Sequence, residues 1–219
     1  MDELLFSRLA MIGASAMLLL TFVVLWRRSV SAYVTAFQWQ SIVLAGTGLA
    51  AAYFARLADL VLVAGMILAV KGLGIPWLLR RMEARLPAQH EISPVVNVEA
   101  ALLIAGVLAI VAYEVSRPVA AVVRLPTRGA IPLAVALVLV SVFVVVNRRK
   151  ATSQIVGFLM LENGVALLAL LGAYGVPLIV ELGVFLDVLL GVLVMQVMVY
   201  RIHETFDSID VEQLARLRH

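Results

Sequence analysis

The sequence has no cysteine and few charged residues, and each absence excludes a class of protein. Without cysteine the chain can form no disulfide and no thiolate-bound zinc or iron–sulfur centre. Its three histidines are scattered, so no metal site is expected: His90, His203 and His219. Charged residues make up 14% of the 219 residues and hydrophobic residues 63%, which lies outside the range of soluble folds. The composition predicts a polytopic membrane protein.

The sequence also lacks the common catalytic motifs. It contains no glycine-rich phosphate loop, no nucleophile elbow and no histidine pair at metal-ligand spacing. We therefore expect no cofactor and no catalysis by this chain alone. The N-terminal apolar run ends in "WRR" rather than in a small-residue cleavage site, so we interpret it as a retained first span.

Long apolar stretches dominate what is present. A bilayer core about 30 Å thick requires about 20 apolar residues per helix. Seven stretches fit, and they predict an all-α bundle of seven transmembrane helices, with a tight turn near Arg56 between the second and third. The predicted spans are 4–26, 31–54, 58–79, 95–115, 130–147, 152–173 and 177–200.

The basic residues predict the orientation of these spans. With the N-terminus outside, eleven of the seventeen basic residues fall on the inner side and five on the outer side, while Lys71 lies within a span. Positive charge favours the cytoplasmic side. We therefore expect a C-terminus on the cytoplasmic side, and we attribute the pI of 9.6 to topology rather than to nucleic-acid binding.

Two segments resemble each other within the chain. "RRSVSAYVTAFQWQSIVLAG" from Arg27 and "RRKATSQIVGFLMLENGVAL" from Arg148 both open a helix after a basic pair, at an offset of 121 residues. This pattern predicts two three-helix units of the same orientation, joined by a connecting helix. A chance match between two apolar hairpins remains the alternative, because composition alone produces such matches.

Three ionisable residues lie near the middle of predicted spans, namely Glu162, Asp187 and Lys71. A charge at the centre of a membrane helix costs at least about 2.5–3.5 kcal/mol, so such residues face one another or a water-filled path. One interpretation is a proton relay, since a dry interior disfavours charge and lets such groups exchange protons. The other is a set of structural bonds from Glu162 or Asp187 to three polar neighbours: Gln38, Gln40 and Asn163.

Other acids lie nearer the predicted span ends. Glu181 is a candidate mouth residue on the outer side. Glu99 lies a turn inside the fourth span and either lines an entry path or is hydrated from the loop. Glu114 and Arg117, three residues apart, are expected to pair.

The C-terminal third resembles a known family. From Asn147 onward, "NRRKATSQIVGFLMLENGVALLALLG" and "VELGVFLDVLLGVLVMQVMVYRIHETFDSIDVEQL" are similar to the small K-type subunit of respiratory complex I and Mrp antiporters. That family has a basic pair followed by one acid in each of two helices. Asp187 matches the second acid, whereas the first aligns with Leu159, one turn before Glu162. With the N-terminal half added, the chain resembles the E component of hydrogenase-4-type nickel–iron hydrogenases and formate hydrogenlyases.

The resemblance implies a membrane subunit of an ion-pumping complex in the cytoplasmic membrane of a bacterium or archaeon. Its implied partners are antiporter-like membrane subunits and a hydrogenase or redox arm. It divides the chain into an N-terminal half (1–146), a K-type hairpin module (147–203) and a cytoplasmic amphipathic tail (204–219). Three alternatives remain, namely a structural scaffold, an Mrp-type antiporter subunit and a self-contained transporter or receptor.

The predicted orientation can be tested in intact cells with a Ser208→Cys variant. Because the chain has no cysteine of its own, a thiol reagent reports on this position alone. We expect a membrane-impermeant reagent to leave Ser208→Cys unmodified until the cells are opened. Labelling from the outside of intact cells would contradict the predicted orientation.

Overall fold

The computed structural model describes residues 2–83, 94–122, 125–149 and 151–172. The chain divides into two units, Met1–Val184 and Phe185–His219, and all described residues belong to the first. Apart from an isolated bridge between Pro94 and Arg148, the described residues are helices and their connections. The elements are α1 (Asp2–Trp26), α2 (Val30–Ala55), α3 (Ala58–Ile67), the π-helical segment η1 (Leu68–Gly74), α4 (Ile75–Glu83), α5 (Val98–Val122), the 3₁₀ segment η2 (Pro126–Ala130), α6 (Ile131–Val146) and α7 (Ala151–Gly172).

Six of the seven predicted spans correspond to described helices, and the all-α fold class is confirmed. Five segments of the described chain are long and apolar enough to cross a membrane. Helix α2 has a similar length, but its two glutamines make it less apolar. The chain is a multi-pass membrane protein. The predicted seventh span (177–200), with Glu181 and Asp187, and the tail lie outside the described residues.

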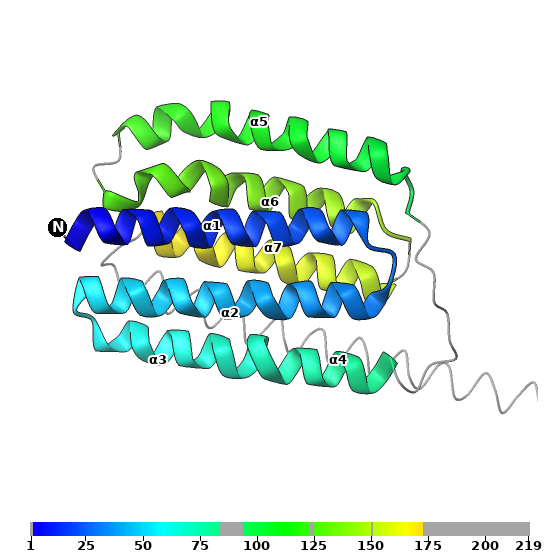
Figure 1. Cartoon of the computed structure of the whole chain (residues 1–219), viewed down its shortest axis with the longest axis horizontal. Coiled ribbons are helices and arrows are strands. Elements are labelled where there is room, and N and C mark those ends of the chain that lie inside the picture. Colours follow the sequence, from blue (N-terminus) through cyan, green and yellow to red (C-terminus); the bar gives the residue numbers. More distant parts are fainter. Residues whose placement is uncertain (1, 84–93, 123–124, 150, 173–219) are drawn as a thin grey trace, which may run out of the picture. The chain divides into compact units, whose positions relative to one another are not determined.

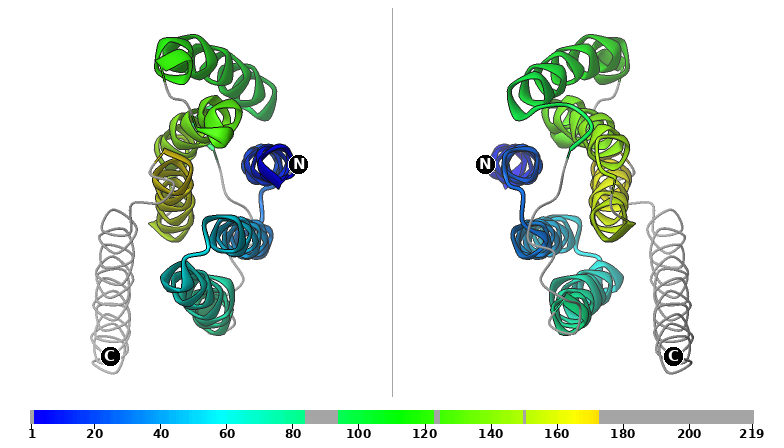
Figure 2. Two further views of the ribbon diagram at one scale, coloured as in Figure 1. Left: turned by 90° about the vertical axis from the view of Figure 1, so that its left-hand side faces the viewer. Right: turned by 90° about the vertical axis from the view of Figure 1, so that its right-hand side faces the viewer.

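Two helical hairpins form the centre of the described bundle. The α1–α2 hairpin lies beside the α6–α7 hairpin, so that α1 contacts α6 and α2 contacts α7 (Figure 1). Helix α5 packs on the outer side of α6, and α3, η1 and α4 pack on α2 (Figure 2). An offset of 121 residues superposes α1 on α6 and α2 on α7. Each of these contacting pairs therefore joins two helices that the internal resemblance makes equivalent. The predicted three-helix units themselves remain a prediction, since the last helix of the second unit is not described.

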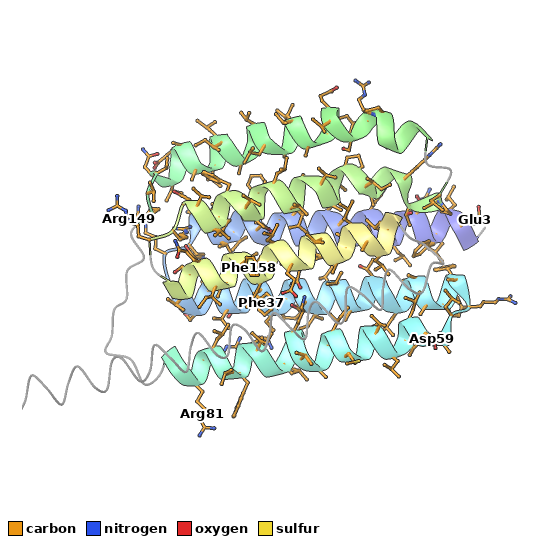
Figure 3. All side chains as sticks on the ribbon, turned by 180° about the vertical axis from the view of Figure 1, so that it is seen from behind. Glu3, Phe37, Asp59, Arg81, Arg149 and Phe158 are labelled. Carbon is orange, nitrogen blue, oxygen red and sulfur yellow. The ribbon has the colours of Figure 1, made fainter. Side chains whose placement is uncertain are left out.

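The pairs of basic residues that follow the helices lie at one end of the described bundle. Arg81 and Arg149 lie at one end, whereas Glu3 and Asp59 lie at the other (Figure 3). This separation arises because successive helices run in opposite directions and the basic pairs follow every second one. It is the arrangement on which the predicted orientation depends.

Two boundaries differ from the sequence prediction. The third predicted span, 58–79, belongs to one continuous helical rod that extends to Glu83, and the middle part of this rod, η1, is π-helical. The fourth, 95–115, continues as α5 to Val122 even though Pro118 lies inside it. The tight turn near Arg56 is confirmed, because Arg56 ends α2 in the left-handed conformation with φ of 56°.

Glycines allow α6 and α7 to approach closely. A Cβ atom on Gly157 would lie 3.1 Å from Val144 Cγ1 and 3.2 Å from the Val145 backbone nitrogen. A Cβ atom on Gly164 would lie 3.1 Å from Val138 Cγ2 and 3.2 Å from the Val138 nitrogen. Between membrane helices such close packing replaces the hydrophobic effect as a source of association. The two glycines, one on each side of Glu162, therefore hold the central part of α7 against α6.

A large residue at Gly164 should force these helices apart. We expect Gly164→Leu to destabilise the protein by about 1–3 kcal/mol through overpacking. Gly106→Leu in α5 is the matched control, because nothing lies within 4 Å of a Cβ atom there. The measurement is the denaturation midpoint in mixed micelles. Equal loss of stability in both variants would contradict close α6–α7 packing.

Candidate functional site

A buried ion pair joins two helices that are distant in sequence. Lys71 Nζ in η1 lies 3.4 Å from Glu162 Oε1 in α7. Lys71 is 2% exposed and Glu162 5% exposed. The distance exceeds the 2.7–2.9 Å typical of a short charge-assisted hydrogen bond, so the contact is a loose ion pair. Each charge lies near the middle of its helical rod and is neutralised by the other.

Asn163 extends this pair into a polar network. Its Oδ1 accepts a hydrogen bond from Lys71 Nζ at 3.3 Å. Its Nδ2 donates to Gln40 Oε1 at 3.2 Å and to Ser41 Oγ at 3.0 Å, both in α2. Gln40 Nε2 in turn donates to Thr21 Oγ1 at 3.1 Å and to the carbonyl of Met17 in α1. Polar side chains thus connect η1, α7, α2 and α1 through the interior of the bundle.

The π-helical geometry of η1 explains how two successive residues, Lys71 and Gly72, both face this interior. The buried positions Leu60 and Ala64 of α3 continue at helical spacing to Lys71. The next buried positions, Pro76 and Leu79, continue instead from Gly72. A π turn holds one more residue than an α turn, so two successive residues face α2 and α7. Such turns occur frequently at functional sites.

Because of Pro76, one backbone carbonyl of this segment accepts its hydrogen bond from a side chain. Proline has no N–H to donate to the carbonyl four residues earlier, which here belongs to Gly72. Gln38 Nε2 donates to that carbonyl at 3.0 Å, and Gln38 Oε1 accepts from Arg80 Nη2 at 2.6 Å. Gln38 therefore ties α2 to η1 and α4.

The predicted site residues separate into three groups. Glu162, Lys71, Asn163 and Gln40 are brought together, whereas Gln38 lies beside them and bonds to Gly72 and Arg80. Glu99 is exposed in the first turn of α5, away from the network. Glu162 forms an ion pair with Lys71, and the polar neighbour that bonds to Gln40 is Asn163. The predicted pair of Glu114 and Arg117 is confirmed at 3.1 Å.

The role of Arg148 was not predicted from the sequence, where this residue contributed only to the positive charge that sets the orientation. It is 1% exposed, and its Nη2 donates to the carbonyls of Val24 and Leu25 at 2.9 and 3.3 Å. Its guanidinium lies over the Tyr33 ring, 5.0 Å from the centroid. Burial lowers the pKa of Arg148 from its ordinary value, yet an arginine stays charged at neutral pH. The cation therefore faces the negative end of the α1 dipole and fastens α1 and α2 to the α6–α7 turn.

A comparison with known proteins places the chain in a family. It is 39% identical over 214 residues to the uncharacterized protein Rv0085 of Mycobacterium tuberculosis, a match that covers 97% of both chains. The chain belongs to the family of that protein. No protein-family model and no solved structure matches the chain.

A second similarity covers only part of the chain. The chain is 28% identical over 116 residues to the hydrogenase-4 component E of Escherichia coli K12 and of Shigella flexneri. The match covers 53% of this chain and 54% of those proteins, so it spans about half the length of each. It supports the resemblance expected from the sequence at the level of the family.

The ion pair makes a sharp prediction about stability. Lys71→Met leaves the Glu162 carboxylate buried without its cation, and breaking a buried pair in this way costs about 3–5 kcal/mol. We expect the double variant Lys71→Met/Glu162→Gln to be more stable than Lys71→Met alone, because no charge then remains to be neutralised. Denaturation midpoints of the parent, both single variants and the double variant give the coupling energy. Additive losses would contradict a direct pair.

Arg148 and Arg149 offer a matched comparison on adjacent positions. Arg148→Ala removes both hydrogen bonds to the end of α1 and the contact with Tyr33, and we expect a loss of about 2 kcal/mol or more. Arg149 is exposed, so Arg149→Ala should change stability by less than about 0.5 kcal/mol. The same micelle assay measures both. Similar losses in the two variants would mean that net charge, rather than the Arg148 contacts, stabilises this end.

Proposed function

We propose that this protein is a membrane subunit of a complex I-like, hydrogenase-4-type ion-pumping complex, and that Lys71 and Glu162 form part of its proton relay. Asp187 is proposed as a further station. The single observation that carries the proposal is the ion pair of Lys71 with Glu162, buried at mid-helix. Similarity to hydrogenase-4 component E supports membership in such a complex.

The geometry of the pair suits proton movement. Because both groups are ionisable and buried together, a proton arriving at the carboxylate or leaving the ammonium changes the charge that the other group senses. The contact of 3.4 Å is longer than a short charge-assisted hydrogen bond. Asn163 and Gln40 then orient the pair and continue the polar connection across α2 toward α1.

The proposed partners follow from the same family resemblance. Antiporter-like membrane subunits and a hydrogenase or redox arm would complete the complex, with the C-terminus on the cytoplasmic side. The chain would link the redox arm to the antiporter-like subunits. The scaffold alternative keeps the same partners but gives the ion pair only a structural role.

Substitutions that remove charge separate these two functions. If the pair relays protons, Glu162→Gln in the assembled complex should lower proton uptake per electron severalfold, because an amide keeps the shape but cannot carry a proton. Lys71→Met and Asp187→Asn should lower it as well. The measurement is coupled proton uptake in sealed vesicles, with the amount of assembled complex determined on a native gel.

A carboxylate outside the network provides the control. Glu114 is exposed and pairs with Arg117 on α5, so Glu114→Gln should leave proton uptake unchanged. If the double variant Glu162→Gln/Asp187→Asn assembles normally and pumps at the parental rate, the relay is wrong and the scaffold role remains.

A further inference from the structure

The oxygen atoms that face Lys71 are of the kind that bind hard metal cations. Glu162 Oε1 lies 3.4 Å and Asn163 Oδ1 3.3 Å from the ammonium nitrogen. Carboxylate and amide oxygens are the ligands that hard cations prefer in proteins. In membrane transporters, sites for sodium ions and protons lie near the bilayer midplane where a helix departs from regular α geometry. Here the departure is the π turn of η1, which does not break the helix, and the position of the cation is taken by a lysine.

The surrounding structure holds the ammonium in that position. Asn163 Nδ2 donates to Gln40 Oε1 and Ser41 Oγ, which turns the amide oxygen toward Lys71. Lys71 lies at helical spacing from the buried residues Leu60 and Ala64 of α3, and it is 2% exposed. The stem of a buried lysine at mid-helix is too short for its charge to reach water at the helix end. The ammonium therefore stays with its two oxygens.

We propose that Lys71 makes this site selective for protons over sodium ions. Its ammonium is an internal cation that occupies the place of a metal ion and holds the two oxygens that would bind one. A sodium ion entering the site would lie beside a fixed positive charge in a dry interior, where repulsion between like charges is strong. A proton needs no vacant position, because it binds to the carboxylate or leaves the ammonium of a pair that is already in contact.

This inference deepens the proposed function and rests on it for the identity of the ion that is moved, but its test measures binding. The full-length chain is placed in lipid nanodiscs, and its unfolding temperature is compared in sodium chloride and in choline chloride at equal ionic strength. A ligand that binds only the folded state raises this temperature with its concentration. The parent should unfold at the same temperature in both salts.

Removing the internal cation should open the site. We expect Lys71→Ala to gain a saturable rise of several degrees with sodium ions, because a short side chain leaves room beside the two oxygens. Lys71→Ser is the second such variant if Lys71→Ala does not fold. Lys71→Met is the matched control, since it removes the charge but fills the space. The double variant Lys71→Ala/Glu162→Gln should lose the sodium effect.

Two results would overturn the proposal. One is a saturable stabilisation of the parent by sodium ions that disappears in Glu162→Gln, which would mean that the site binds sodium despite Lys71. The other is the absence of any sodium effect in Lys71→Ala and Lys71→Ser, which would mean that the oxygens do not form a cation site. Both concern binding, so neither can be mistaken for failure of the relay, which the vesicle assay reports independently.

Discussion

The rest of this structure depends on one constraint, which is that a charge inside an apolar bundle must have a partner. Lys71 and Glu162 meet this constraint together, across 91 positions of sequence. Neither helix could present its charge to lipid without a penalty of a few kcal/mol. The pair therefore fixes how η1 and α7 are rotated about their axes, and α2 between them supplies the polar groups that complete the site.

Two local features make that pairing possible. The π turn of η1 rotates Lys71 and Gly72 into the same interface, and Gln38 satisfies the Gly72 carbonyl that Pro76 cannot. On the other side, Gly157 and Gly164 let α7 lie close against α6. The charged site is thus built on a closely packed hairpin on one side and on a helix with a π turn on the other.

The ends of the bundle use a different kind of contact. Arg148, in the α6–α7 turn, donates a hydrogen bond to a carbonyl at the C-terminal end of α1 and packs against the face of the Tyr33 ring. Its neighbour Arg149 remains exposed. Two adjacent arginines of the same basic run therefore serve different purposes, one in fastening the hairpins and the other, as we propose, in setting orientation.

The sequence by itself determined the class of the fold, the positions of six helices except for the C-terminal end of α5, and the presence of Glu162 and Lys71 far from any helix end. It did so because apolar length and buried charge are local properties of the chain. It did not determine that Lys71 faces Glu162, that Asn163 rather than Glu162 contacts Gln40, or that Arg148 is buried. The helices are apolar on nearly every side, and lipid is as apolar as a protein core, so hydrophobic periodicity cannot tell which face of a helix points inward. Only the tertiary structure decided those rotations, because they follow from the close approach at Gly157 and Gly164, the π turn and the pairing of charges.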